Sequence, residues 1–182
     1  YSHGIASIAR CEAYAMTRDA NLRGPAQGAI NFIVYAQDPV GGGWRYDPQE
    51  PGDTSVVGWQ LMALKSGHMA YLTVPAVTVR KASQFLDSVQ SVSGANYGYT
   101  GPGQGPSTEA TTAIGMLCRM YLGARKDDSH LENGIKWLGR HGPNNNLYYD
   151  YYATQVMRHW EGEPWTKWNA VMRDELVSSQ SK

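Results

Sequence analysis

The segment 28–46 recurs at 81–99, at a constant offset of 53 residues and without a gap. The identical pairs are Ala29 and Ala82, Phe32 and Phe85, Gln37 and Gln90, Gly41 and Gly94, and Tyr46 and Tyr99. Trp44 falls on Tyr97, another large aromatic residue. A fixed period in this range indicates one supersecondary unit that is copied and stacked. The repeat therefore predicts a stacked architecture before any functional residue is considered.

Apolar residues recur at helical spacing between glycine and proline, and strand signals are nearly absent. We therefore predict an all-α chain. The expected helices are 4–18, 25–38, 54–70, 75–91, 108–124, 129–141, 150–160 and 164–180. The predicted start signals are Pro25, Pro75 and Pro164 in first helical turns, and Asp53 and Ser107 as N-caps.

The expected helices alternate in character along the chain. Helices 54–70 and 108–124 are apolar over most of their surface, which is typical of helices buried on several sides. The helices between them are more amphipathic. We therefore expect four hairpins, each with an inner and an outer helix. Gly58 and Gly115 lie inside inner helices, where close helix–helix approach would offset a cost of about 1 kcal/mol each.

Two weaker copies follow the clear ones. The first, at an offset of 52, aligns Gly134, Trp137 and Leu138 with Ala82, Phe85 and Leu86. The second begins near the end of the chain, with the spacing of Leu176 and Gln180. We therefore expect residues 1–182 to form a single repeat domain that belongs to a longer array. Apolar faces at the open ends of such an array would favour self-association.

Composition excludes several classes of function. Sixteen basic residues balance sixteen acidic ones, so no net field favours nucleic acid. No apolar stretch approaches the ~20 residues that span a bilayer. Cys11 and Cys118 have no metal-binding spacing, so we expect buried free thiols, with a disulfide or a metal ligand as the alternatives. The pattern indicates no cofactor and does not specify a compartment.

The repeat resembles a known family at particular residues. Gly28-Ala29, Ile33, Gln37 and Gly42-x-Trp44 resemble the QW motif of the terpenoid cyclase and prenyltransferase superfamily, and Lys81-Ala82, Leu86 and Gln90 resemble its first half. The stretch GGGWRYDPQEPGDTSVVGW looks most like bacterial squalene-cyclase-like proteins of unassigned activity. The resemblance implies an α/α toroid, here partial, in which inner helices surround a cavity. It also implies that Gln37, Trp44 and Gln90 brace helices and carry no chemistry.

The family's catalytic signatures are incomplete in this chain. Squalene–hopene cyclases use an Asp-x-Asp-Asp-Thr acid motif, of which Pro51-Gly52-Asp53-Thr54 keeps the last two positions. Protein prenyltransferase β subunits have Asp-Thr-Cys at the corresponding helix start, where two residues bind zinc. This chain has Asp53-Thr54-Ser55, and a zinc site without its thiolate is not expected. We therefore predict no metal site.

Titratable groups stand at four predicted inner-helix starts: His3, Asp53, Glu109 and Asp150. Helix N-termini favour anionic groups, so N-capping alone is one explanation and a functional cluster is the other. As candidate catalytic residues we name Asp53, Glu109 and Asp150. The candidate ligand-binding residues form an aromatic cup beside these starts: Trp44, Tyr46, Tyr97, Tyr99, Tyr149 and Tyr152.

Three functions are compatible with the sequence. The first is a toroid domain that binds an apolar or extended ligand, or a partner domain, in an aromatic concavity. The second is an isoprenoid-processing enzyme with Asp53, Glu109 or Asp150 as general acid. The third is a carbohydrate-active α/α-toroid enzyme with a paired acid and base. Fold analogy alone does not choose among them.

Overall fold

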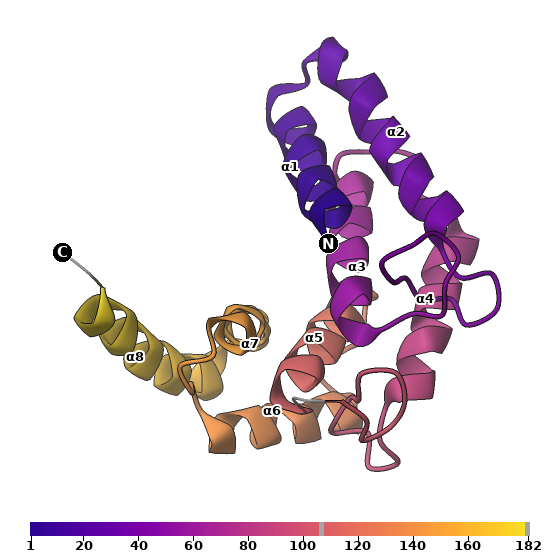
Figure 1. The fold of residues 1–182 in the computed structure, drawn as a ribbon. Helices are drawn as coiled ribbons and strands as arrows, with labels where there is room; N and C mark the ends of the chain where they lie inside the picture. The colour runs from indigo at the N-terminus through magenta and orange to yellow at the C-terminus, as the bar shows by residue number, and fades with distance from the viewer. Residues whose placement is uncertain (106–107, 181–182) are drawn as a thin grey trace. The chain divides into compact units, whose positions relative to one another are not determined.

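A computed structural model describes residues 1–105 and 108–180, and within them the chain is all-α, as predicted (Figure 1). An isolated antiparallel bridge joins Gln90 and Tyr97. The described part contains eight helices: α1 (Ser2–Thr17), α2 (Ala20–Ala36), α3 (Thr54–Met69), α4 (Ala76–Val89), α5 (Thr108–Tyr121), α6 (Ser129–His141), α7 (Leu147–Trp160) and α8 (Gly162–Ser179).

The helix starts follow local capping chemistry. Asp53 caps α3 as predicted, because its carboxylate accepts from the Val56 backbone N–H. Pro164 lies in the first turn of α8, as predicted, whereas Pro75 immediately precedes α4. Ser107 lies outside the described residues.

The prediction for Pro25 was wrong. The helix begins five residues earlier, at Ala20, because the Asp19 side chain accepts from the Asn21 N–H and caps it there. Pro25 is therefore an interior residue of α2. A proline at this depth removes one backbone donor from the helix.

The chain divides into two compact units, residues 1–89 and 90–182. In unit 1, α1 packs against α2 and α3, and α3 also packs against α4. In unit 2, α5 packs against α7 and α6, and α7 packs against α8. Each unit therefore buries its own set of helix faces.

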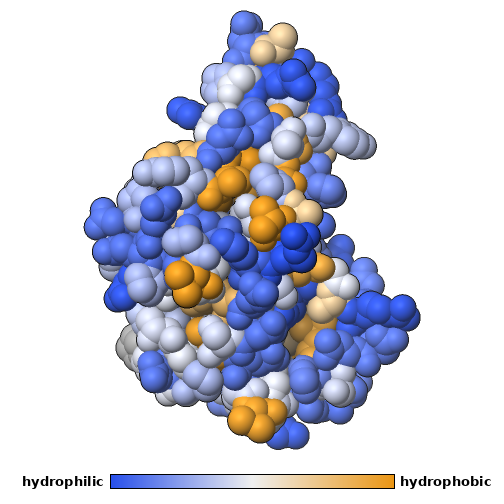
Figure 2. Space-filling view, turned by 90° about the vertical axis from the view of Figure 1, so that its right-hand side faces the viewer, coloured by the Kyte–Doolittle hydropathy of each residue, from blue (hydrophilic) through white to orange (hydrophobic). Residues whose placement is uncertain are grey.

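Two helices are buried on most sides. In α3, 12 of 16 residues are buried, and in α5, 9 of 14, which agrees with their apolar sequences. By contrast, α1 buries only Gly4, Ser7 and Cys11, although we predicted an inner helix there. Its Ile5 is 48% exposed and its Met16 85%. On the face shown in Figure 2, apolar residues form several small groups among polar ones.

The loops after α2 and α4 repeat the same backbone contact. The Asp38 N–H donates to the Gly43 carbonyl over 2.9 Å, and 53 residues later the Ser91 N–H donates to Asn96 over 2.8 Å. In the first loop, the indole N–H of Trp44 donates to the Ile33 carbonyl over 2.7 Å. The sequence repeat is therefore a repeat of loop geometry as well as of helices.

Candidate functional site in unit 1

An aromatic pocket of about 80 Å³ lies in unit 1. Its walls come from the start of α1, the second half of α2, the loop 44–48 and the interior of α3. Arg45 and Asp47 add one charge of each sign to its lining, and its aromatic and amide residues are Tyr1, His3, Phe32, Trp44, Tyr46 and Gln60. We call this the aromatic pocket. It brings together two of the predicted ligand-binding residues, Trp44 and Tyr46.

The rings of the pocket are in contact with one another. Tyr1 and Tyr46 have ring centroids 6.0 Å apart, and His3 and Phe32 have centroids 4.6 Å apart. Tyr46 is 63% exposed and Phe32 44%, so the pocket opens onto an aromatic surface. Trp44 is 2% exposed and forms the inner wall. Such a surface offers a large contact area with few rotatable bonds.

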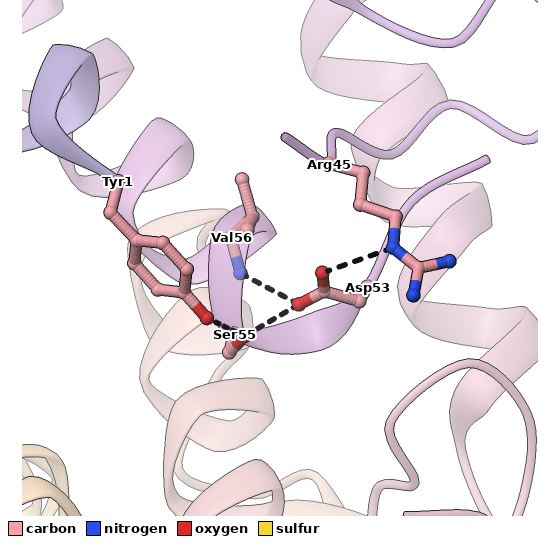
Figure 3. A network of polar contacts seen from close by, with 5 residues as sticks. All are labelled: Tyr1, Arg45, Asp53, Ser55 and Val56. Atoms are coloured by element: carbon pink, nitrogen blue, oxygen red, sulfur yellow. Dashed lines mark hydrogen bonds and ion pairs between the residues drawn. The ribbon is translucent and has the colours of Figure 1, made fainter. Parts of the chain in front are cut away.

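A chain of hydrogen bonds connects the pocket to Asp53, which has no exposed surface (Figure 3). The Ser55 hydroxyl donates to Asp53 Oδ1 over 2.5 Å. Since a serine hydroxyl has one proton, the Tyr1 hydroxyl, 2.5 Å from Ser55 Oγ, must donate to it. Burial, and less strongly the Asp53 charge, raise the pKa of Tyr1. The Tyr1 phenol therefore keeps its proton and directs it inward.

Arg45 approaches Asp53 from the side opposite Tyr1 and Ser55 (Figure 3). Its Nε lies 3.9 Å from Asp53 Oδ2, and its guanidinium carbon lies 5.8 Å from the centre of the Tyr46 ring. In all of these contacts the Asp53 carboxylate is the acceptor. This is the role of an N-cap, the simpler of the two explanations that we considered for Asp53.

Gln60 is the buried polar residue of the aromatic pocket. It is 6% exposed and is the seventh residue of α3, between Trp59 and Leu61. Among the described residues its Oε1 has no hydrogen-bond partner. A buried carbonyl without a donor is unfavourable by about 1–3 kcal/mol. The lining of the pocket thus includes a buried side-chain amide whose carbonyl is unpaired.

The remaining predicted site residues belong to unit 2. Tyr97 is 3% exposed and packs against Gly115, and its hydroxyl accepts from Arg119 Nε over 3.3 Å. Burial raises the pKa of Tyr97. Tyr99 is half-buried, and its backbone N–H donates to the Gln104 carbonyl. These contacts give Tyr97 a packing role, while ligand binding by either tyrosine stays a prediction.

Tyr149 and Tyr152 are fully buried. The Tyr149 hydroxyl donates to the Gly142 carbonyl over 3.0 Å, and its ring meets that of Trp168 edge-on. Burial raises the pKa values of both tyrosines. Their rings form part of the unit 2 core, and their predicted role in binding remains untested.

Two of the predicted catalytic acids also lie in unit 2. Glu109 is half-buried in the first turn of α5, and Asp150 is 3% exposed in the first turn of α7. Asp150 Oδ1 accepts from the Asn144 N–H over 3.3 Å, whereas Oδ2 has no partner among the described residues. Burial, together with the nearby Glu175 carboxylate, raises the pKa of Asp150. The environment of Asp150 therefore favours the neutral carboxyl.

A second hollow, of about 490 Å³, lies along the first half of α2. Its lining includes Ala20, Gly24 and Gly28, and also Gln27, which exchanges two hydrogen bonds with the Thr73 backbone. Arg23 and Asn31 also line it, but no aromatic side chain does. We therefore take the aromatic pocket as the candidate site.

Sequence reasoning named Trp44, Tyr46 and Asp53 as candidates, but it did not name Gln60 or Tyr1. A polar residue inside the apolar run of α3 was the signal available for Gln60. Tyr1 offered no comparable signal, because its partner Ser55 is 54 residues away. Only the packing of α1 against α3 brings the two together.

Comparison of the chain with known family models, curated proteins and solved structures finds no match in any of the three. The resemblance to squalene-cyclase-like proteins therefore stays a prediction. Within residues 1–105 and 108–180, no three histidine, cysteine or acidic side chains are placed to hold a metal ion. No helix in the same part of the chain is long and apolar enough to cross a bilayer.

Proposed function

We propose that this chain is a binding module, and that unit 1 takes an apolar group of a small molecule or of a partner domain into the aromatic pocket. The observation that carries the proposal is the convergence of aromatic rings around one cavity whose lining also includes the buried amide of Gln60. Binding sites for organic ligands combine an apolar lining with a few polar groups in this way. The family resemblance points to the same class of ligand.

The size of the pocket favours binding over cyclisation. Its volume of about 80 Å³ is well below the ~300 Å³ at which drug-sized ligand pockets begin. A cyclase must surround a whole polyprene, whereas this pocket admits a ring or a short branch of a longer ligand. The rest of such a ligand would lie on the exposed rings of Phe32 and Tyr46.

The isoprenoid-processing alternative receives less support from the environment of Asp53. Tyr1 and Ser55 lie between the pocket and Asp53 Oδ1, and this oxygen accepts from both Ser55 and the Val56 N–H. A general acid must instead reach the reacting atom. The candidate acids Glu109 and Asp150 belong to unit 2. The carbohydrate-active alternative needs a paired acid and base across a groove, and no observation favours it.

We further propose that the repeated helical pairs are part of an α/α toroid. The support is the repeated loop contact at Asp38 and Ser91 and the burial of α3 and α5. In such an arrangement the start of α3 faces the concave side, where the aromatic pocket would receive a ligand. Low-resolution scattering of the full chain tests the proposal, because a curved array has a larger radius of gyration than a compact globule of equal length.

Binding can be tested with toluene and farnesol as probes. Both should shift the indole N–H resonance of Trp44 in the full chain. Tyr46→Ala should weaken binding about fivefold, since a lost ring contact is worth about 1 kcal/mol. Tyr71→Ala, at another exposed tyrosine of unit 1, is the matched control. No change in the Trp44 resonance at millimolar probe would refute the proposal.

A further inference from the structure

We infer that the aromatic pocket binds the trimethylammonium group of a small organic cation, with its rings as the walls of a cage and Asp47 as the counter-charge. The inference rests on the proposed function, because the methyl groups of such an ion form the apolar surface that the pocket would enclose. Three features of the pocket carry it: its paired rings, a cation already placed at one of them, and an unpaired carboxylate.

The rings at the pocket are held together as neighbours. The ring pairs Tyr1–Tyr46 and His3–Phe32 line one cavity, and Trp44 closes it on the inner side. The face of an aromatic ring is negative and attracts a cation that lies within about 6 Å of its centroid, most strongly where water is excluded. Several rings around one small cavity therefore suit a quaternary ammonium ion.

The ring of Tyr46 already lies beside a cation of the protein. The guanidinium carbon of Arg45 is 5.8 Å from the centre of this ring, within the range of a cation–π contact. Arg45 Nε also lies 3.9 Å from Asp53 Oδ2, so the buried carboxylate offsets the charge of the guanidinium (Figure 3). Tyr46 is 63% exposed, which leaves ring surface for a ligand.

Asp47 supplies the charge that is left over. It lines the pocket and is exposed, and it makes no hydrogen bond or ion pair among residues 1–105 and 108–180. Glu50, three residues further along the same loop, is also exposed. Because Asp53 offsets Arg45, the acidic loop leaves the surroundings of the pocket with a net negative charge. This charge favours a cation over an anion.

A trimethylammonium group neither donates nor accepts a conventional hydrogen bond. Its fit therefore does not depend on which way the Gln60 amide is oriented, or on the direction of the Tyr46 hydroxyl proton. A primary ammonium ion differs, because its three N–H donors need acceptors. It would lose hydration in a pocket whose walls are mainly aromatic.

The test compares choline with two matched ligands. One is 3,3-dimethylbutan-1-ol, which has the same shape without the charge, and the other is ethanolamine, which has the charge without the methyl groups. Dissociation constants for the full chain are measured from the Trp44 indole N–H resonance at low ionic strength, where surface charges are least screened. Choline should bind about tenfold more tightly than either, the gain expected when a cation meets partly desolvated rings.

Two variants test the roles of the ring and of the carboxylate. Tyr46→Leu keeps an apolar surface and should remove most of the preference for choline over the neutral alcohol, whereas Tyr71→Leu, at another exposed tyrosine of unit 1, should keep it. Asp47→Asn should weaken choline binding about threefold and leave the neutral alcohol unchanged, because an exposed charge is partly screened. Asp87→Asn, at an exposed position of α4, is its control. Thermal unfolding checks that each variant is folded.

The same cation occurs on free solutes and on lipid headgroups, and phosphocholine distinguishes the two. The exposed carboxylates of Asp47 and Glu50 disfavour a phosphate, so a free solute is the expected source. Phosphocholine should therefore bind less tightly than choline. Equal or tighter binding of phosphocholine would overturn the assignment to a free solute.

The outcomes separate the inference from the proposed function. Equal or tighter binding of 3,3-dimethylbutan-1-ol, or a preference for choline that survives in Tyr46→Leu or is unchanged in Asp47→Asn, overturns the inference and leaves the binding module intact. Equal binding of ethanolamine also overturns it, since charge alone would then explain the affinity. Binding of none of the three, and of neither toluene nor farnesol, overturns the proposed function together with the inference.

Discussion

Gln37 and Gln90, 53 residues apart, each donate their side-chain amide to a glycine carbonyl in the loop that follows. The acceptors are Gly42, at 2.8 Å, and Gly94, at 2.9 Å. Gln37 also donates to the Thr78 carbonyl over 3.0 Å and so connects α2, its loop and α4. Gln90 instead accepts from Arg119 over 3.0 Å. The repeated glutamines thus stabilise loops, and their second contacts differ between the copies.

Replacing Gln37 by Leu should therefore destabilise the chain by about 2–3 kcal/mol, because two carbonyls lose their donor in a buried place. Urea unfolding followed by circular dichroism measures the change. Gln84→Leu, on the exposed face of α4, should change stability by less than about 0.5 kcal/mol. Similar values for the two variants would show that Gln37 does not connect the helices.

At Asp53 the substitutions to Ala and Asn should differ. Asp53→Ala removes the acceptor for the Val56 N–H and the Ser55 hydroxyl, and should lower stability by about 1–2 kcal/mol. Asp53→Asn keeps an oxygen at the cap and should cost less. Thermal denaturation provides the comparison. Ligand uptake by Asp53→Asn should equal that of the unmodified chain. Turnover of a polyprenoid that disappears in this variant would contradict the binding module.

Gly115 and Gly139 should respond oppositely to alanine. A Cβ at Gly115 would lie 2.3 Å from the ring of Tyr97, which is buried and held by hydrogen bonds from and to α5. Overpacking of this kind costs about 1–3 kcal/mol. At Gly139, exposed within α6, the nearest atom is Met157 Cε at 4.0 Å, so alanine should stabilise the helix by about 0.5–1 kcal/mol. The urea concentrations at the unfolding midpoints of the two variants measure these changes. A Gly139→Ala variant that is less stable than the unmodified chain would contradict the prediction.

Gly115 also illustrates how far the sequence could predict the fold. Periodicity and punctuation predicted eight helices and a close contact at this glycine, but the neighbour is a loop tyrosine and not another helix. The 53-residue repeat predicted the similarity of the loops after α2 and α4, because both loops are held by contacts between residues close in sequence. The aromatic pocket depends on α1 packing against α3, a contact with no counterpart in the repeat, so Tyr1 and Gln60 could not be inferred from it.

The raised pKa of Asp150 predicts a dependence of stability on pH. Burial favours the neutral carboxyl, with the Glu175 charge adding to the effect, so the folded chain holds this proton more tightly than the unfolded chain. This stabilisation is complete below the ordinary aspartate pKa of about 4 and is lost as the pH rises through the folded value. Asp150→Asn removes the titration. The variant should gain stability relative to the unmodified chain between pH 4 and pH 8.

Urea unfolding at pH 4, 6 and 8 measures this difference. Glu175→Gln should also make stability less dependent on pH. It removes the neighbouring negative charge that raises the pKa of Asp150, but it leaves Asp150 buried. A stability difference between Asp150→Asn and the unmodified chain that stays constant across this range would show that Asp150 does not titrate differently in the folded and unfolded states.

Both cysteines are free and buried, as the sequence predicted, and this has a measurable consequence. Burial raises the pKa of Cys11 to about 11 and that of Cys118 to about 12. At pH 8 the thiolate forms would then be about one part in a thousand and one in ten thousand, and thiolate is the reactive species. Neither residue should react with Ellman's reagent on the scale of minutes in the native chain, whereas both should react at once in guanidinium chloride. Rapid reaction of Cys11 alone would contradict the packing of α1, since its side chain has no exposed surface there.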